Sequence, residues 1–193
     1  MALDVSRGLS GPIGVAVGSD GTVYVPEFST GAVSEYFKGK TSPSLTLTVP
    51  GAEGVALDAK NNLYVSFNDP STGEGAVEEF APKKKTGTNL GITVEFAGDV
   101  KLNKKGDLLV EDQIAQAVDF FKPKATSPYG SISVAPFNAY KEALNAAETE
   151  LYIATVSDEV DIFDAVPSGK NVGSITSGLE AVTGVSLSPA APL

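Results

Sequence analysis

Short apolar runs bounded by turn residues recur along the chain as one repeating pattern. Each copy opens with a triplet such as Val15-Ala16-Val17, and the five triplets begin at residues 15, 55, 100, 142 and 185. Successive copies therefore start 40, 45, 42 and 43 residues apart. A second run follows seven or eight residues after the start of the first. A third run ends in an aromatic residue (Phe37, Phe80, Phe121 or Phe163), and a weaker fourth is rich in Ser and Thr.

The chemistry of these runs predicts β-strands. They are four to six residues long, rich in Val, Tyr, Phe and Thr, and bounded by Gly, Asn, Asp or Pro. Dipeptides such as Asp20-Gly21 and Lys105-Gly106 supply tight turns between the first and second runs. Repeats of this length with four strands each are typical of β-propellers. The one helical-looking segment, residues 138–150, stands where a first strand is expected, and we interpret it as part of a degenerate copy.

The sequence thus predicts an all-β protein, a β-propeller of four-stranded antiparallel blades with four full repeats and a partial fifth. Its 193 residues form one domain, 1–193. The expected blades cover residues 11–50, 51–94, 95–134 and 135–176, and a partial blade combines 177–193 with 1–10. Three arrangements fit an incomplete ring: a fragment of a larger propeller, closure with a defective fifth blade, or completion by another copy of the chain. Open sheet edges pair readily, so a homo-oligomer is one expected partner state.

The segments GPIGVAVGSDGTVYVPEF (residues 11–28) and AEGVALDAKNNLYVSFN (residues 52–68) carry a resemblance to known proteins. They resemble the NHL-repeat and gluconolactonase-like (SMP-30-like) group of β-propellers. This resemblance covers most of the chain. It implies a propeller scaffold, and scaffolds of this kind host many unrelated functions.

Composition narrows the chemistry available to the chain. It contains no Cys and no His, which removes thiolate chemistry, the commonest general base and the commonest transition-metal ligand. The net charge of −10 argues against nucleic acid as a partner. No run approaches the roughly 20 apolar residues of a membrane-spanning helix, so no membrane span is expected. The start, MALDVSRGL, lacks the apolar core of a signal peptide, yet a secreted or periplasmic protein is preferred over a cytoplasmic one.

In a propeller, the loops joining strands one to two and three to four open on one face, and the remaining loops open on the other. The sequence predicts a basic first face and an acidic second face. The first set of loops holds most of the lysines: Lys38, Lys40, Lys60, Lys83, Lys84, Lys85, Lys104, Lys105, Lys122, Lys124 and Lys170. The run Lys83-Lys84-Lys85 is interpreted as a solubilising loop tip.

Ligands of propellers usually sit where the starts of strand one and the ends of strand two converge around the axis. Four carboxylates stand at such positions: Glu27, Glu53, Asp99 and Asp112. Clustered carboxylates raise one another's pKa or share a hard cation such as Ca²⁺ or Mg²⁺. The sequence therefore predicts a candidate metal site formed by these four residues. The resemblance to gluconolactonase-like enzymes implies an oxygen-only site of Glu, Asn and Asp, with Glu53 as first ligand and Asn138 or Asp112 as others.

Two functions follow from these patterns. The first is a non-catalytic module that binds a protein, peptide or glycan through one face, or acts as a structural repeat. The second, which the resemblance suggests, is a divalent-metal-dependent lactonase-type hydrolase with an axial carboxylate site, in which Glu53 and Asp112 act as ligands or general base.

Overall fold

The computed structural model describes residues 8–134, 139–164 and 169–187. This part of the chain contains four antiparallel sheets of four strands each, and it contains no helix. The predicted all-β class and the four repeats are therefore confirmed. The helical-looking segment forms strand β13 and the start of β14, and Asn138 lies outside the described residues. Because the described residues form no helix, none of their segments is a candidate for a helical membrane span.

Each sheet is a simple meander in which consecutive strands pair. The strands of the first two sheets are β1 (Ala16–Val17), β2 (Val23–Glu27), β3 (Ala32–Tyr36), β4 (Leu45–Thr48), β5 (Ala52–Leu57), β6 (Leu63–Asn68), β7 (Gly75–Phe80) and β8 (Thr88–Val94). Those of the last two sheets are β9 (Ala97–Leu102), β10 (Leu108–Asp112), β11 (Ala117–Phe121), β12 (Gly130–Ser133), β13 (Ala139–Leu144), β14 (Glu150–Thr155), β15 (Val160–Asp164) and β16 (Asn171–Ile175).

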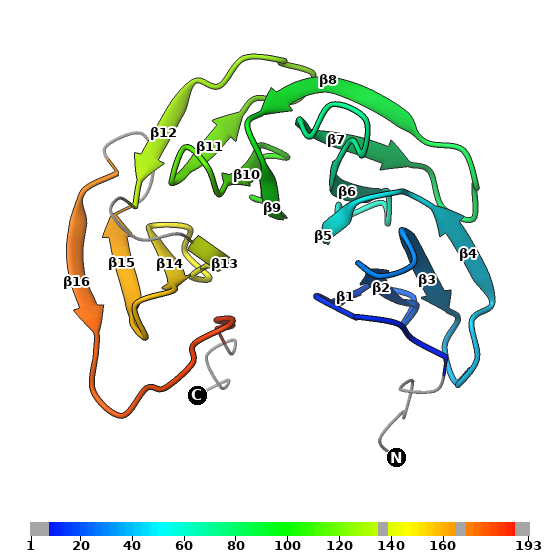
Figure 1. Ribbon diagram of the computed structural model, residues 1–193, viewed down its shortest axis with the longest axis horizontal. Coiled ribbons are helices and arrows are strands. Elements are labelled where there is room, and N and C mark those ends of the chain that lie inside the picture. The colour runs from blue at the N-terminus through cyan, green and yellow to red at the C-terminus, as the bar shows by residue number, and fades with distance from the viewer. Residues whose placement is uncertain (1–7, 135–138, 165–168, 188–193) are drawn as a thin grey trace.

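The four sheets stand like blades around a common centre and form an open arc (Figure 1). The first strand of each blade (β1, β5, β9 and β13) lies toward the centre, and the fourth (β4, β8, β12 and β16) lies at the rim. The arc is interrupted between the first blade and the last. The described residues after β16 form no strand, but they turn back toward the centre, where Gly184 and Val185 line a cavity together with Val15 and Lys141. Residues 1–7 and 188–193 of the predicted partial blade lie outside the described residues.

The hydrophobic core is divided into three clusters, one at each boundary between neighbouring blades. In the first, Val33 and Leu47 of blade one pack against Val55 and Val65 of blade two. Equivalent residues repeat this arrangement between blades two and three and between blades three and four. The aromatic residue that ends the third run, Phe80, Phe121 or Phe163, is a member of each cluster. The apolar runs recur because every boundary needs the same apolar faces.

Blades two and three also approach closely at the channel. A Cβ atom on Gly54 would lie 2.8 Å from the Cα atom of Asp99, so only glycine fits between the two first strands. The side chain of Asn68 bridges the same boundary, donating to the carbonyl of Ala97 at 2.9 Å and accepting from its N–H at 2.8 Å. Ser66 donates to the carbonyl of Gly98 at 2.6 Å. These polar contacts fix the register of two blades whose backbones are almost in contact.

The blades on either side of the break expose apolar positions that are buried elsewhere. Val15 is 63% exposed, whereas its equivalent Val55 is 4% exposed. At the other side, Ile175 is 46% exposed, whereas Leu47 and Ile132, which occupy the same register position, are almost fully buried. The difference arises because the described residues provide no neighbouring sheet for these two flanks. Whether another copy of the chain covers them stays a prediction.

Replacing Gly54 by alanine tests the close approach of blades two and three. The added Cβ would collide with backbone atoms of Asp99, so we expect Gly54→Ala to lower the free energy of unfolding by about 1–3 kcal/mol. Gly173→Ala in β16 is the matched control, since a Cβ there meets no atom within 4 Å and the change should be neutral or slightly stabilising. Urea unfolding of the three proteins measures both effects. Equal stability of the two variants would contradict the packing described.

Candidate functional site

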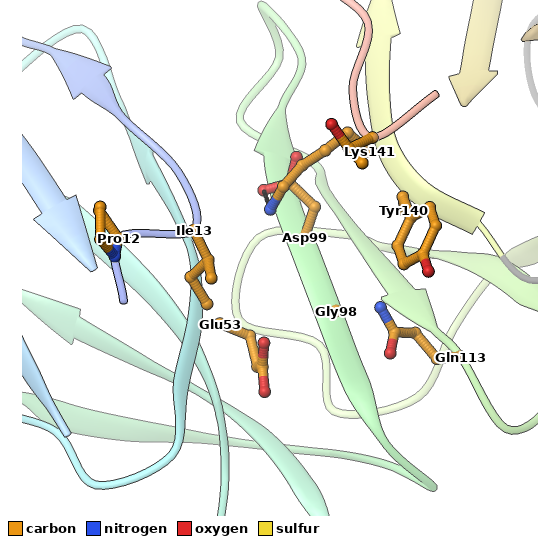
Figure 2. A pocket seen from close by; sticks show the side chains of 9 residues that line it. Pro12, Ile13, Glu53, Gly98, Asp99, Gln113, Tyr140 and Lys141 are labelled. Atoms are coloured by element: carbon orange, nitrogen blue, oxygen red, sulfur yellow. Dashed lines mark ion pairs between the residues drawn. The ribbon is translucent and has the colours of Figure 1, made fainter. Parts of the chain in front are cut away.

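A cavity of about 470 Å³ opens at the axial end of the channel, where the first strands of the blades begin. We call it the axial pocket. Figure 2 shows that its polar side chains come from several blades and surround a common space. Its polar lining consists of Glu53, Asp99, Gln113, Tyr140, Lys141 and Thr183. Pro12, Ile13 and Gly98 complete the wall. The strand-one starts identified in the sequence therefore converge on one cavity.

A shift in strand register near the start of the first strand directs side chains of three blades into the axial pocket. In blades two, three and four the pairing of the first strand with the second shifts register near the start of the first strand. In blades two and four the shift leaves Glu53 and Tyr140 as extra residues, and in blade three it falls at Gly98 and Asp99. Such β-bulges bend a strand and redirect its side chains. All four residues line the axial pocket, so the repeated bulge builds the site.

Asp99 is a buried carboxylate in the lining of the axial pocket, with two lysines beside it. Its side chain is almost fully buried and forms ion pairs with two lysines, Lys101 on the same strand and Lys141 on β13. The Nζ atom of Lys141 lies 3.5 Å from Oδ1 of Asp99. Burial of Lys101 opposes its charge, but the nearby Asp99 carboxylate outweighs this and raises the pKa of Lys101. The two lysines thus balance the buried carboxylate across the boundary between blades three and four.

Two further carboxylates lie close to Asp99, fully buried. Glu111 on β10 accepts a hydrogen bond from the N–H of Asp99 at 2.7 Å, and its other oxygen has no partner among the described residues. Neither oxygen of Glu142 on β13 has a partner among them. Burial raises the pKa of Glu111 to about 7, and burial together with the charge of Asp99 raises that of Glu142 well above its usual range. Both side chains therefore keep their protons to a higher pH than an exposed glutamate does.

We call Asp99, Lys101, Glu111, Lys141 and Glu142 the channel cluster. The strand patterns of the sequence did not predict this cluster, but an alignment of the repeats contains a signal for it. Glu142 occupies the position of Val15, Val55 and Val100 in the other copies. Likewise, Asp99 occupies the position of a glycine in the first two copies, and Lys101 that of an alanine. Aligned copies therefore differ in charge at positions that face the channel. Among the cluster members, only Asp99 was predicted as a site residue.

The structure separates the four carboxylates that the sequence predicted as a metal site. Glu53 and Asp99 line the axial pocket, whereas Glu27 and Asp112 do not. Glu27 accepts hydrogen bonds from the N–H of Ser10 at 2.9 Å and the hydroxyl of Ser34 at 2.5 Å.

Asp112 accepts hydrogen bonds from the backbone N–H groups of Glu95, Phe96 and Ala115 at 2.7–3.3 Å. Glu27 and Asp112 therefore both accept hydrogen bonds from loop backbone N–H groups. Their use in metal binding stays a prediction.

The oxygen donors of the axial pocket are already engaged in contacts within the protein. Both oxygens of Asp99 already face lysine ammonium groups. Asn68 is the last residue of β6, and the sequence patterns did not identify it as a site residue. Its side-chain amide donates to Oε1 of Glu53 at 3.4 Å, and its side-chain oxygen accepts from the N–H of Ala97. Within the described ranges no group of three or more acidic side chains is arranged to hold a metal ion. We therefore derive no step through a metal here.

Comparison with known proteins supports the fold. The sequence matches no protein-family profile, and no curated protein matches it either. The structure is similar to that of Kuenenia stuttgartiensis hydrazine synthase, with a TM-score of 0.68 and 18% sequence identity over 90% of this chain. The chain spans about half the length of that protein, 51%. At this identity the similarity indicates a β-propeller fold and carries no information about activity.

Glu111→Gln tests the buried carboxylates through the pH dependence of stability. Because folding raises the pKa of Glu111 from 4.5 to about 7, its stabilising contribution is fully present below pH 4.5 and is lost as the pH rises through about 7. Gln keeps an acceptor for the Asp99 N–H but cannot ionise. We expect the variant to be more stable than the wild type at pH 8, by roughly 1–3 kcal/mol, with a smaller difference at pH 4. Urea unfolding across this range measures it, and a pH-independent difference would contradict the buried charge.

Proposed function

We propose that the protein is a non-catalytic β-propeller module that binds a glycan in the axial pocket. The observation that carries this proposal is the combination of an exposed aromatic ring and a ring of mixed hydrogen-bonding groups around one cavity. Tyr140 is 42% exposed and lies opposite Glu53 in the pocket wall (Figure 2). The cavity volume is in the range of sites for small ligands.

The chemistry of the lining suits a polyhydroxylated ligand. Sugar hydroxyls both donate and accept hydrogen bonds, and the pocket offers acceptors on Glu53 and donors on the Gln113 amide and the Lys141 ammonium group. The face of the Tyr140 ring offers an apolar surface for the C–H groups of a sugar ring. Glu53 and Asp99 oppose a single ammonium group in the lining, so the pocket is close to neutral and slightly acidic.

Several features support binding rather than catalysis. Glu111 and Glu142, whose pKa values are raised by burial, do not line the axial pocket, so they cannot exchange protons directly with a ligand there. The lining carboxylate Asp99 is held between two lysines. The chain lacks His and Cys as alternative bases or nucleophiles.

Tyr140→Ala tests the glycan-binding proposal. A glycan array followed by titration calorimetry identifies a ligand, and the variant should bind it about ten-fold more weakly because the stacking surface is lost. Tyr140→Phe keeps the ring and should bind nearly as well as the wild type, which separates stacking from loss of fold. Binding of peptides but not glycans, or equal binding by wild type and Tyr140→Ala, would overturn the proposal.

The alternative hydrolase function has one supporting observation, the presence of Glu53 and Asp99 in the same pocket. The glycan proposal expects no change in melting temperature when Ca²⁺, Mg²⁺, Zn²⁺ or Mn²⁺ is added. A metal that binds the folded state would raise the melting temperature by ligand linkage. A rise that disappears in Glu53→Gln would instead favour the hydrolase related to the gluconolactonase-like group. A thermal-shift scan distinguishes the two outcomes.

A further inference from the structure

Eleven exposed lysines stand on the loops at one end of the four blades, and we call this surface the lysine face. These loops join the first strand to the second or the third to the fourth within a blade. Six of these loops carry the lysines, and every blade contributes at least one lysine. The lysines are Lys38, Lys40, Lys60, Lys83, Lys84, Lys85, Lys104, Lys105, Lys122, Lys124 and Lys170.

The loops of the lysine face contact one another between blades one and two and between blades three and four. The loop after β1 meets the loop after β5, where Ser19 donates to the side chain of Asn61 at 2.9 Å. The Nζ atom of Lys83, in the loop after β7, lies 5.8 Å from the ring centre of Phe37, the residue after β3.

The same relation holds between the last two blades. The N–H of Lys104 donates to Glu148, in the loop after β13, at 2.6 Å. The lysines of different blades therefore share a face.

The lysine face is strongly basic although the protein is acidic. Its loops hold eleven lysines and four carboxylates (Asp20, Asp58, Asp107 and Glu148), a formal charge of +7 against −10 for the whole chain. Asp107 is buried and bound by Lys122 at 2.9 Å. Within the part of the chain that the structure describes, Lys122 is the only one of the eleven that forms an ion pair with a carboxylate. Of the other ten ammonium groups, that of Lys104 donates to the carbonyl of Ala146, and none of the ten is neutralised by a carboxylate within the described residues.

We propose that the lysine face binds the surface of an anionic lipid bilayer. The lysines are spread over six loops of all four blades, and a planar array of headgroups can contact them together, whereas a nucleic-acid duplex would meet only one row. Among the described residues of these loops, Tyr129 is the only large hydrophobic side chain with substantial exposure. The binding is therefore electrostatic, without insertion of side chains into the hydrocarbon region.

The net negative charge of the protein does not prevent this binding. Exposed carboxylates such as Glu74, Glu95 and Glu180 lie on the loops at the opposite ends of the blades. A strand of six residues such as β5 is roughly 20 Å long, and charges are screened beyond about 8 Å at physiological ionic strength. The bilayer therefore interacts mainly with the lysine face. The axial pocket opens at the starts of the first strands, at the end opposite the lysine face, so this inference is independent of what the pocket binds.

Co-sedimentation with lipid vesicles tests the proposal. The full chain should bind vesicles of phosphatidylcholine containing roughly a third phosphatidylserine, should not bind pure phosphatidylcholine, and should dissociate as salt is raised. The variant K40Q/K84Q/K105Q removes one lysine from each of three blades, at side chains without a described partner. It should bind about 100-fold more weakly, at about five-fold for each lysine. K83Q/K84Q/K85Q, confined to one loop, should weaken binding to a similar degree.

The matched control is E74Q/E95Q/E180Q, which changes the net charge by the same magnitude with the opposite sign on the opposite face and should leave vesicle binding unchanged. Far-ultraviolet circular dichroism and melting curves show that each variant is folded. Absence of wild-type binding to anionic vesicles, equal binding to zwitterionic vesicles, or binding by K40Q/K84Q/K105Q as tight as that of the wild type would overturn the proposal. Binding to duplex DNA or heparin without binding to vesicles would overturn it as well.

Discussion

The packing of one blade's apolar flank against the next is the interaction on which the rest of the structure depends. Each of the three core clusters combines residues from two neighbouring sheets, so no blade buries its apolar residues alone. A four-stranded sheet with two apolar faces is unstable in water until both faces are covered. The close approach at Gly54 and the bridging side chain of Asn68 belong to the same constraint, because they align the first strands that surround the channel.

The site results from two departures from this regular packing. Bulges near the starts of the first strands in blades two to four direct side chains into the axial pocket instead of the inter-blade cores. At the boundary of blades three and four, charged residues replace the small and apolar residues of the other copies. Asp99 and Lys141 belong to both groups, since they line the pocket and take part in the channel cluster. The polarity of the pocket and the buried charge below it are therefore coupled.

The sequence was sufficient for the fold but only in part for the site. The period and the strand chemistry predicted four four-stranded sheets, and the convergence of strand-one starts placed Glu53 and Asp99 at the pocket. The hydrogen bonds that loop N–H groups donate to Glu27 and Asp112 could not be predicted from the sequence, because they depend on the path of the backbone in these loops. Glu111 and Glu142 were missed because a strand pattern shows alternation of faces, but it does not show which polar group lies beneath a neighbouring blade.

The division of the core into three clusters has a consequence for how the molecule opens. Within the described residues, the two interior sheets pack against a sheet on both sides, whereas the two sheets next to the break pack against one. Stability in such a linear array is approximately a sum over nearest neighbours, so local opening begins at the ends and proceeds inward. Amide protons of β6 and β10 would then exchange with solvent most slowly, and those of β2 and β15 earlier. For the described residues, the break in the arc thus sets the order in which the sheets open.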